Sequence, residues 1–306
     1  MIPLTSGLAY FDLRFRGLPR IIATAVIQWP GGVALIDPGP TSTLPALDAE
    51  LSRAGIAWAD VRCLLLTHIH LDHAGATGTI VRAHPHVRVY VHEKGAPHLV
   101  DPSKLLSSAT RLYGDEMDLL WGEVRAVPPE ALTVLRGGER IDLGRAIEVA
   151  YTPGHASHHV SYFADGIAFV GDTAGVRVVQ DGYVLPATPP PDVDLAVWED
   201  SLRRIGAWHP DALFLTHFGP STPARTHMSA FTDHLEWTSA FVKASVAPDE
   251  KDEQDDVHEA AFMDEVRKEL RRHMSEADAQ AYEVAGRFDL SWRGLARYWR
   301  KASGSR

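Results

Sequence analysis

The chain has 306 residues, enough to bury a full hydrophobic core, and 45% of them are hydrophobic, as in ordinary globular proteins. Its net charge of −10 disfavours nucleic acid as a partner, because an acidic chain repels phosphate backbones unless its basic residues gather in one patch. A single cysteine, Cys63, excludes an internal disulfide framework. We find neither a signal-peptide pattern nor an apolar run of membrane-spanning length. We therefore expect a cytoplasmic protein without a membrane segment.

Three strands and a helix are predicted for the first part of the chain. Residues 8–15 alternate in polarity, residues 21–28 are apolar and β-branched, and residues 33–37 run into a turn at Asp37. Residues 44–55 form an amphipathic pattern that ends in glycine, which predicts a helix.

A cluster of potential metal ligands follows the next apolar run, residues 61–66. His68 and His70 lie two residues apart on an extended segment, so their side chains point the same way. Asp72 and His73 come after the chain turns and face another direction. Imidazole and carboxylate are donors that suit zinc and its neighbours. The pattern predicts a metal site, and its two pairs of ligands indicate two ions.

Helices dominate the segment after this cluster. We expect a helix from about His73 to Ala83 and then a strand over residues 87–91. Residues 105–114 and 115–124 form two short amphipathic pieces. Their larger apolar side chains either line a substrate wall or only pack an inserted helix pair; these are Tyr113, Met117, Leu120 and Trp121.

The remaining pattern returns to strands and then becomes helical. Strands are predicted over residues 131–135, 146–152, 159–164, 167–172 and 213–216. A proline-rich connection leads to a helix over residues 195–208, which Asp194 is placed to cap. Beyond it we predict helices over residues 224–245 and 258–303, joined by an acidic segment at 247–256.

Basic residues gather only near the C-terminal end, where three aromatic residues are interleaved with them. A helix that packs Trp292, Tyr298 and Trp299 inward and leaves its arginines in solvent is favoured over a nucleic-acid patch. We therefore expect a small-molecule substrate rather than nucleic acid. The pattern does not predict an oligomeric state.

Further motifs follow predicted strands in a fixed order. They are Asp-Pro-Gly at 37–39, Thr-Pro-Gly-His at 152–155, Gly-Asp at 171–172 and Thr-His at 216–217. Together with His-x-His-x-Asp-His at 68–73, this series resembles the metallo-β-lactamase superfamily over residues 8–220. The resemblance implies an α/β fold, an αββα sandwich of two mixed β-sheets flanked by helices. Residues 1–220 would form the catalytic domain and residues 221–306 a helical C-terminal extension.

The resemblance also implies a complete set of site residues. One metal would be held by His68, His70 and His155, and a second by Asp72, His73 and His217. Asp172 would span both metals, and Asp72 would also orient the nucleophile. Two further residues, Asp37 and His159, would support the ligands from outside, whereas His158 is expected to be exposed. Five imidazoles and two carboxylates favour two Zn²⁺ ions, with iron or manganese as alternatives.

The implied activity is hydrolysis by a hydroxide that bridges two metal ions and attacks the ester, thioester or lactone carbonyl of a small molecule. Thr-Pro-Gly-His-x-x-x-His at 152–159 and the helical C-terminal part are similar to the glyoxalase II branch of the superfamily. Two alternatives stay open: a phosphodiesterase or nuclease, and an iron-dependent oxidoreductase of the persulfide dioxygenase kind. A non-catalytic binding protein is disfavoured, because every ligand position of the motif series is filled.

Overall fold

The computed structural model describes residues 1–179, 182–246 and 254–304, and two mixed β-sheets form its centre. The first sheet has its seven strands in chain order, antiparallel from β1 to β4 and parallel from β4 to β7. These strands are β1 (Ile2–Thr5), β2 (Leu8–Asp12), β3 (Ala23–Trp29), β4 (Gly32–Ile36), β5 (Val61–Leu65), β6 (Arg88–His92) and β7 (Leu132–Leu135).

The second sheet has six strands in the order β13-β12-β11-β10-β9-β8. Only the neighbouring strands β11 and β12 are parallel, and the other pairs are antiparallel. The strands are β8 (Arg140–Asp142), β9 (Ala146–Tyr151), β10 (Val160–Ala164), β11 (Ile167–Gly171), β12 (Ala212–Leu215) and β13 (Gly219–Ser221). The prediction missed β1, β8 and β13, which are short strands at the edges of the two sheets.

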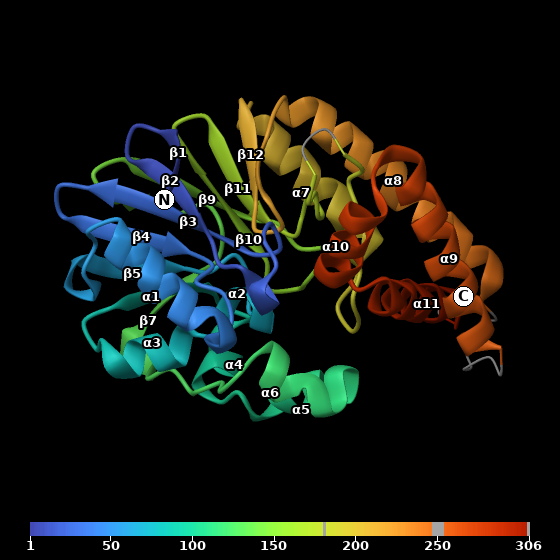
Figure 1. Ribbon diagram of the computed structural model, residues 1–306, viewed down its shortest axis with the longest axis horizontal. Helices are drawn as coiled ribbons and strands as arrows, with labels where there is room; N and C mark the ends of the chain where they lie inside the picture. The colour runs from blue at the N-terminus through green and yellow to red at the C-terminus, as the bar shows by residue number, and fades with distance from the viewer. Residues whose placement is uncertain (180–181, 247–253, 305–306) are drawn as a thin grey trace.

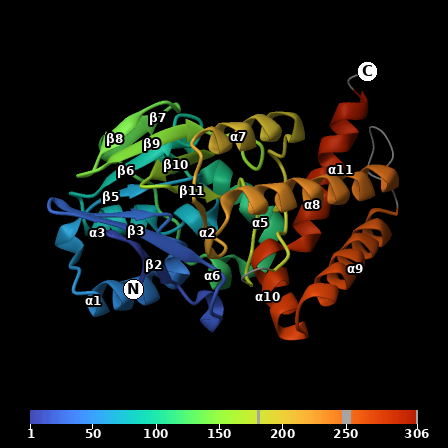
Figure 2. The same cartoon turned by 90° about the horizontal axis from the view of Figure 1, so that it is seen from above.

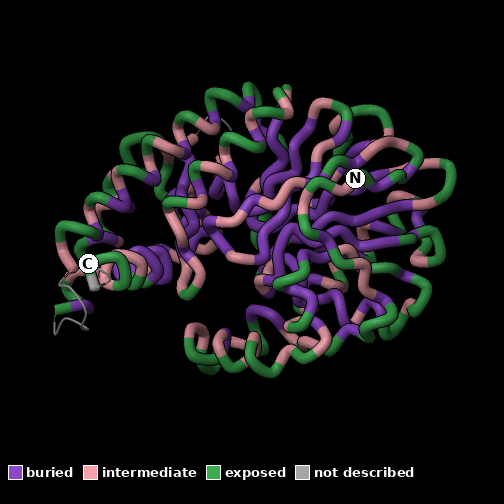
Figure 3. Tube along the Cα trace, turned by 180° about the vertical axis from the view of Figure 1, so that it is seen from behind, coloured by how far each residue is buried: buried purple, intermediate pink, exposed green. Residues whose placement is uncertain are grey.

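The two sheets pack face to face over one apolar layer. Ile27 and Leu65 from the first sheet belong to the same buried cluster as Tyr162, Phe169 and Phe214 from the second. Because successive side chains of a strand point to opposite faces, the neighbours of these residues turn outward toward helices. Figure 3 shows the buried chain running through the middle of the molecule.

Helices cover both outer faces, which confirms the predicted αββα sandwich (Figure 1). Val26 and Leu64 of the first sheet pack in one cluster with Leu47 and Ile80 of the helices that cover it. The helices on this side are α1 (Leu44–Arg53), α2 (Leu71–Ala74), α3 (Thr77–Ala83), α4 (Ala96–Val100), α5 (Ser103–Tyr113) and α6 (Met117–Leu120). The predicted helix from His73 to Ala83 is thus divided into α2 and α3.

The second sheet is covered by α7 (Leu195–Ala207) and the first part of α8 (Ala224–Ser245). As predicted, the side chain of Asp194 caps α7, accepting hydrogen bonds from two backbone N–H groups of its first turn. The C-terminal helices α9 (Asp255–His273), α10 (Glu276–Gly286) and α11 (Phe288–Gly304) pack with α8 around a cluster of their own (Figure 2). Most of the predicted acidic segment, residues 247–253, lies outside the described residues.

The basic C-terminal segment is helical, as predicted, and forms α11. Trp292 is buried, and Arg293 and Arg300 form ion pairs with Glu259 and Asp255 of α9. The positive charge of this helix is therefore partly neutralised within the fold. Over the residues that the structure describes, no helix has both the length and the apolar character needed to cross a membrane.

Candidate metal centre

The residues of the predicted metal site come from one edge of the sandwich. Asp37 follows β4, the cluster of residues 68–73 follows β5, Asp172 follows β11 and His217 lies just beyond β12. Each of these strands is parallel to its neighbour in the set, so their carboxyl ends lie at the same edge of each sheet. His155 joins them from the loop between β9 and β10.

A first group is made of three histidine nitrogens. The Nδ1 atom of His70 lies 3.0 Å from Nε2 of His68 and 3.0 Å from Nε2 of His155. The outer nitrogen of His155 donates to the carbonyl oxygen of Ala187 at 2.8 Å. The hydroxyl of Thr67 is already used to donate to a carboxylate, so Nδ1 of His68 donates to Thr67 Oγ1. The Nε2 atoms of His68 and His155 therefore carry no hydrogen and can only accept a hydrogen bond. Nδ1 of His70 lies near both of them but has at most one hydrogen, so it can donate to only one of the two.

A second group contains Asp72, His73 and His217. The Oδ2 atom of Asp72 lies 3.2 Å from Nε2 of His217 and 3.8 Å from Nε2 of His73. Both imidazoles are fixed from behind: Nδ1 of His217 donates to the carbonyl oxygen of Ile21 at 2.6 Å, and Nδ1 of His73 donates to Asp37 at 2.8 Å. In the neutral form of each ring, Nε2 therefore faces the group without a hydrogen.

Asp172 faces both groups with different oxygens. Its Oδ1 lies 3.3 Å from Nε2 of His73 and 3.6 Å from Nε2 of His217, while its Oδ2 lies 3.5 Å from Nε2 of His155. The seven side chains named from the sequence motifs are thus brought together, with Asp172 between the two groups.

Buried atoms without partners show that these residues fit divalent cations. Nε2 of His73, Nε2 of His217 and Oδ1 of Asp172 are buried and make no hydrogen bond. An unsatisfied buried polar atom costs about 1–3 kcal/mol, and here three of them point at one another. A cation between them would satisfy all three, and the donor set matches zinc and its neighbours.

The electrostatics keep three of the donors, His68, His70 and Asp172, in the form that binds a metal. Burial and then the neighbouring imidazoles lower the pKa of His70 to about 4, and the same effects hold the pKa of His68 well below its ordinary value. Burial favours the neutral form of Asp172, but His73 and His217 outweigh this effect and hold the pKa of Asp172 well below its usual range. At neutral pH His68 and His70 are therefore neutral and Asp172 is ionised, as metal ligands must be. Burial favours the neutral form of His73 and His217, but Asp172 and Asp72 outweigh it and raise the pKa of both imidazoles, so a divalent ion would compete with a proton at these two rings.

Asp37 contacts the second group through His73. It is fully buried and accepts hydrogen bonds from the backbone N–H and hydroxyl of Thr67, from the hydroxyl of Thr216 and from His73. One carboxylate thus links the loops after β4, β5 and β12. Four donors converging on it fix both its rotamer and the ring plane of His73.

His159 contacts the loops that carry two of the donors, His155 and Asp172. Its Nδ1 lies 3.0 Å from the hydroxyls of Thr152 and Thr173, and its Nε2 accepts a hydrogen bond from the backbone N–H of Asp172 at 3.3 Å. His159 therefore connects the loop that carries His155 with the loop that carries Asp172.

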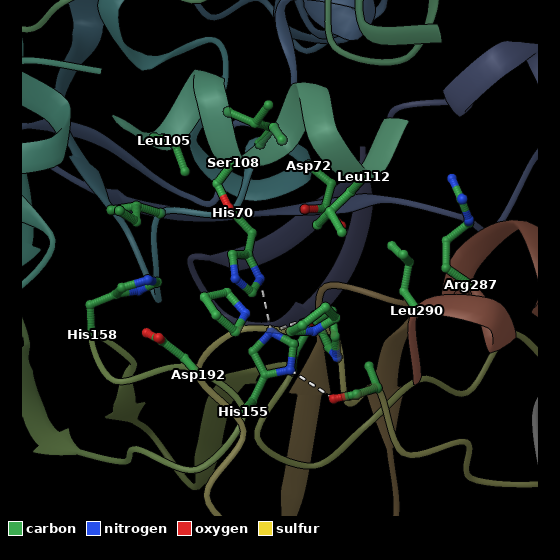
Figure 4. A pocket seen from close by; sticks show the side chains of 18 of the residues that line it. His70, Asp72, Leu105, Ser108, Leu112, His155, His158, Asp192, Arg287 and Leu290 are labelled. Carbon is green, nitrogen blue, oxygen red and sulfur yellow. Dashed lines mark hydrogen bonds and ion pairs between the residues drawn. The ribbon is translucent and has the colours of Figure 1, made fainter. Parts of the chain in front are cut away.

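A cavity of about 330 Å³ opens in front of the two groups (Figure 4). His70, Asp72, His155 and Asp172 form part of its floor. The volume lies in the range of sites for small molecules. Its walls come from α5, from the proline-rich connection at 187–192 and from the turn between α10 and α11.

Several residues of this cavity differ from the sequence interpretation. His158 was expected to be exposed, but only 8% of its surface is accessible, because it packs beside His68 and His70 at the edge of the cavity. Of the expected wall residues, Tyr113 lines the cavity, whereas Leu120 and Trp121 are buried behind it and Met117 packs against the core.

The actual apolar wall consists of residues that the pattern did not single out. Leu105, Ala109 and Leu112 on α5 lie on one side, and Leu290 of α11 lies on the other. The signal for the α5 residues was present as the stripe at positions i, i+4 and i+7 of an amphipathic helix. Leu290 carried no such signal, because its place depends on how α11 packs across the fold.

Comparison with known proteins identifies the family of this chain. The family model of the metallo-beta-lactamase superfamily matches residues 18–217. A metallo-beta-lactamase fold-containing protein, ST1585 of Sulfurisphaera tokodaii, is 31% identical over 164 residues, which cover 52% of this chain and 61% of that protein. A hydroxyacylglutathione hydrolase of Buchnera aphidicola is 31% identical over 148 residues, which cover 48% of this chain and 45% of that protein. This chain thus spans less than two thirds of the length of either relative.

Solved structures show the same fold over nearly the whole chain. The crystal structure of ST1585 from Sulfolobus tokodaii, an archaeal metallo-beta-lactamase superfamily protein, has a TM-score of 0.65 at 22% identity and covers 96% of this chain and 99% of that one. A metallo-beta-lactamase family protein from Thermus thermophilus has a TM-score of 0.67 at 21% identity, covering 98% of this chain and 95% of that one. The shared fold therefore includes the C-terminal helices.

Proposed function

This chain belongs to the metallo-β-lactamase superfamily, and from that membership we propose that it is a metal-dependent hydrolase that cleaves an ester, thioester or lactone of a small molecule at a centre of two divalent ions. The observation that carries the proposal is the set of donor atoms on seven side chains that face one another, three of them buried without hydrogen-bond partners. The relatives named hydroxyacylglutathione hydrolases support an acyl compound as the substrate class.

Each ion has its own group of protein ligands in this proposal. His68, His70 and His155 would hold one ion, and Asp72, His73 and His217 the other; Asp172 lies between the groups and would contact both. Five imidazoles and two carboxylates without a thiolate suit Zn²⁺ best, and they also accept iron or manganese.

The two divalent ions would supply the nucleophile. Held here, they would lower the pKa of a bound water to near 7 and provide hydroxide at neutral pH. Asp72 is the ligand whose carboxylate is partly open to the cavity, with 24% of its side chain accessible. We assign it the role of orienting the nucleophile and passing its proton toward the leaving group. The cavity in front of the two groups would position the substrate carbonyl beside them.

Metal removal tests the proposal directly. We expect the purified protein to contain about two divalent ions per chain and to hydrolyse at least one member of a panel of p-nitrophenyl esters, thioesters and lactones. A chelator should abolish this activity, and Zn²⁺ added back should restore it. Elemental analysis before and after chelation provides the measurement. Full activity in metal-free protein would refute a metal-dependent hydrolase, and turnover confined to bis-p-nitrophenyl phosphate would indicate a phosphodiesterase instead.

Replacing one ligand of the first group tests the assignment of the ions. His70→Ala removes the nitrogen that lies 3.0 Å from two other donors, so we expect hydrolysis to fall by about tenfold or more and bound metal to drop below two per chain. His273→Ala, which changes an exposed histidine at the end of α9, is the matched control and should keep both values. A His70→Ala protein with full activity and full metal content would overturn the ligand assignment.

A further inference from the structure

A second cavity adjoins the one in front of the metal groups. Its volume is about 210 Å³, and its walls come from the segment after β2, from the ends of α5 and α6 and from α10. The two cavities share two lining residues, Tyr113 and Arg287. Tyr113 is the last residue of α5, and Arg287 lies between α10 and α11. These two side chains therefore separate the cavities.

The ring of Tyr113 is held by two different parts of the chain. The guanidinium carbon of Arg287 lies 5.1 Å from the ring centre, a distance at which a cation is attracted to an aromatic ring. Trp121, which follows α6, meets the same ring edge-on, with 5.0 Å between the ring centres. Trp121 in turn stacks on Phe15, with 5.7 Å between their ring centres. The Tyr113 ring thus links the helices over the first sheet with the C-terminal helices.

Arg287 is itself anchored, and its charge is compensated. Its guanidinium donates two hydrogen bonds to the carboxylate of Asp289, at 3.1 and 2.9 Å. A contact of this kind at two points fixes the plane of the guanidinium as well as its position. Arg287 is therefore a rigid part of the wall beside Tyr113.

The first cavity is apolar where it approaches this pair. Figure 4 shows Leu290 and Arg287 on the side away from His158 and Asp192. Leu112 of α5 lines the cavity as well. Leucine side chains from α5 and α11 thus form a surface for the hydrocarbon part of a ligand.

The second cavity continues this apolar surface. Its apolar lining residues are Phe15, Leu120, Trp121 and Val284. Three charged residues line only this cavity: the exposed Arg16 and Glu116, and Glu283, which forms an ion pair with Arg267. A hydrocarbon chain that passed Tyr113 would therefore meet aromatic and aliphatic side chains.

From these contacts we propose that Tyr113 and Arg287 form a partition that sets the length of the hydrocarbon chain accepted by the metal-site cavity. A substrate with its scissile carbonyl at the metal groups extends its chain along Leu112 and Leu290 and stops at the Tyr113 ring. Removal of this ring joins the two cavities and gives a longer chain room beside Trp121. The inference rests on the proposed hydrolase function and names two residues that determine its specificity.

A series of straight-chain acyl thioesters of N-acetylcysteamine, from butanoyl to dodecanoyl, tests the partition. The measured quantity is the ratio of kcat/KM for the decanoyl over the hexanoyl compound. We expect Tyr113→Ala to raise this ratio at least about tenfold over the wild type, because each CH₂ group that becomes buried favours binding by about fourfold. An unchanged ratio in a folded Tyr113→Ala protein would overturn the inference.

Two control variants separate the bulk of the ring from other effects. Tyr113→Phe keeps the ring and should keep the wild-type ratio. Tyr298→Ala removes a half-buried tyrosine of α11 that lines neither cavity, and it should keep the ratio as well. A rise in Tyr113→Phe equal to that in Tyr113→Ala would refute a partition made by the ring.

Two more variants test the second cavity and the other half of the partition. Val284→Trp added to Tyr113→Ala fills the second cavity from α10, so it should bring the ratio back toward the wild-type value. A ratio that stayed high would show that the longer chain gains its room elsewhere and would overturn the inference. Arg287→Ala provides a second opening of the partition should Tyr113→Ala lose its fold, and we expect it to raise the ratio about threefold; no rise there would refute the partition.

Binding measurements distinguish a failure of this inference from a failure of the proposed function. Calorimetry uses the acyl amides of N-acetylethylenediamine, in which nitrogen replaces the thioester sulfur and prevents turnover. Binding limited by chain length, with the limit lifted in Tyr113→Ala, would support the partition even in a protein that hydrolyses none of the thioesters, and would then refute the hydrolase. Hydrolysis of the thioesters with the same chain-length profile in the wild type and Tyr113→Ala would support the hydrolase and overturn the partition.

Discussion

Asp172→Asn is expected to reduce kcat by about a thousandfold or more, equivalent to about 4 kcal/mol of transition-state stabilisation. The carboxylate is the side chain shared by the two groups of donors, with Oδ1 at 3.3 Å from His73 Nε2 and Oδ2 at 3.5 Å from His155 Nε2. An amide of the same shape removes one negative charge and turns one ligand atom into an N–H donor that faces unprotonated nitrogens. Both ions would lose a ligand, so we expect metal content to fall together with activity.

The measurements are kcat on the best substrate of the panel and metal content by elemental analysis. Asp211→Asn is a suitable control. This exposed carboxylate lies just before β12, the strand that leads to His217, and it does not line the cavity. It should behave like the wild type. If Asp172→Asn retained two ions and more than about a tenth of the wild-type kcat, Asp172 could not be a ligand of both ions.

Asp37→Ala is expected to damage both stability and metal binding although Asp37 touches no substrate. The change leaves the hydroxyls of Thr67 and Thr216, the backbone N–H of Thr67 and Nδ1 of His73 without their acceptor in a fully buried place. Each lost partner costs about 1–3 kcal/mol, so we expect the free energy of unfolding to fall by at least about 3 kcal/mol. The ring of His73 also loses its orientation, which should weaken metal binding about 10–100-fold.

Chemical denaturation gives the free energy of unfolding, and competition with a chelator gives the metal affinity. Asp233→Ala on the exposed side of α8 controls for removing an aspartate and should leave both quantities near their wild-type values. Asp37→Asn separates the two effects, because an amide keeps the shape and one acceptor atom but removes the charge behind His73. Equal metal affinity in Asp37→Ala and the wild type would show that Asp37 has a structural role alone.

The two halves of the cavity have different origins in the fold. The metal side is built from loops at the carboxyl ends of strands, where both sheets hold the backbone rigidly. The apolar side comes from α5 and from the start of α11, which face each other across the cavity. Substrate preference can therefore change through these helices while the metal groups stay the same.

The sequence by itself determined most of the strands, and its motif series implied the αββα fold and the convergence of the seven donors through the resemblance to the superfamily. The strands could be predicted because the information for them is local. A buried strand reads as an apolar run, and a polar residue directly after it lies at the carboxyl end of a strand, as His68, Asp172 and His217 do. The same locality explains the misses at β1, β8 and β13, which are edge strands of only three or four residues.

Only the tertiary structure decided what surrounds the metal side. His158 and His159 are adjacent in the chain, and their sequence does not show that both are buried, His159 against the loop after β11 and His158 at the cavity. Likewise, Leu290 meets α5 only because the C-terminal helices pack back across the molecule. Contacts between segments far apart in the chain depend on the packing of many residues at once, and a single pattern along the sequence carries no record of them.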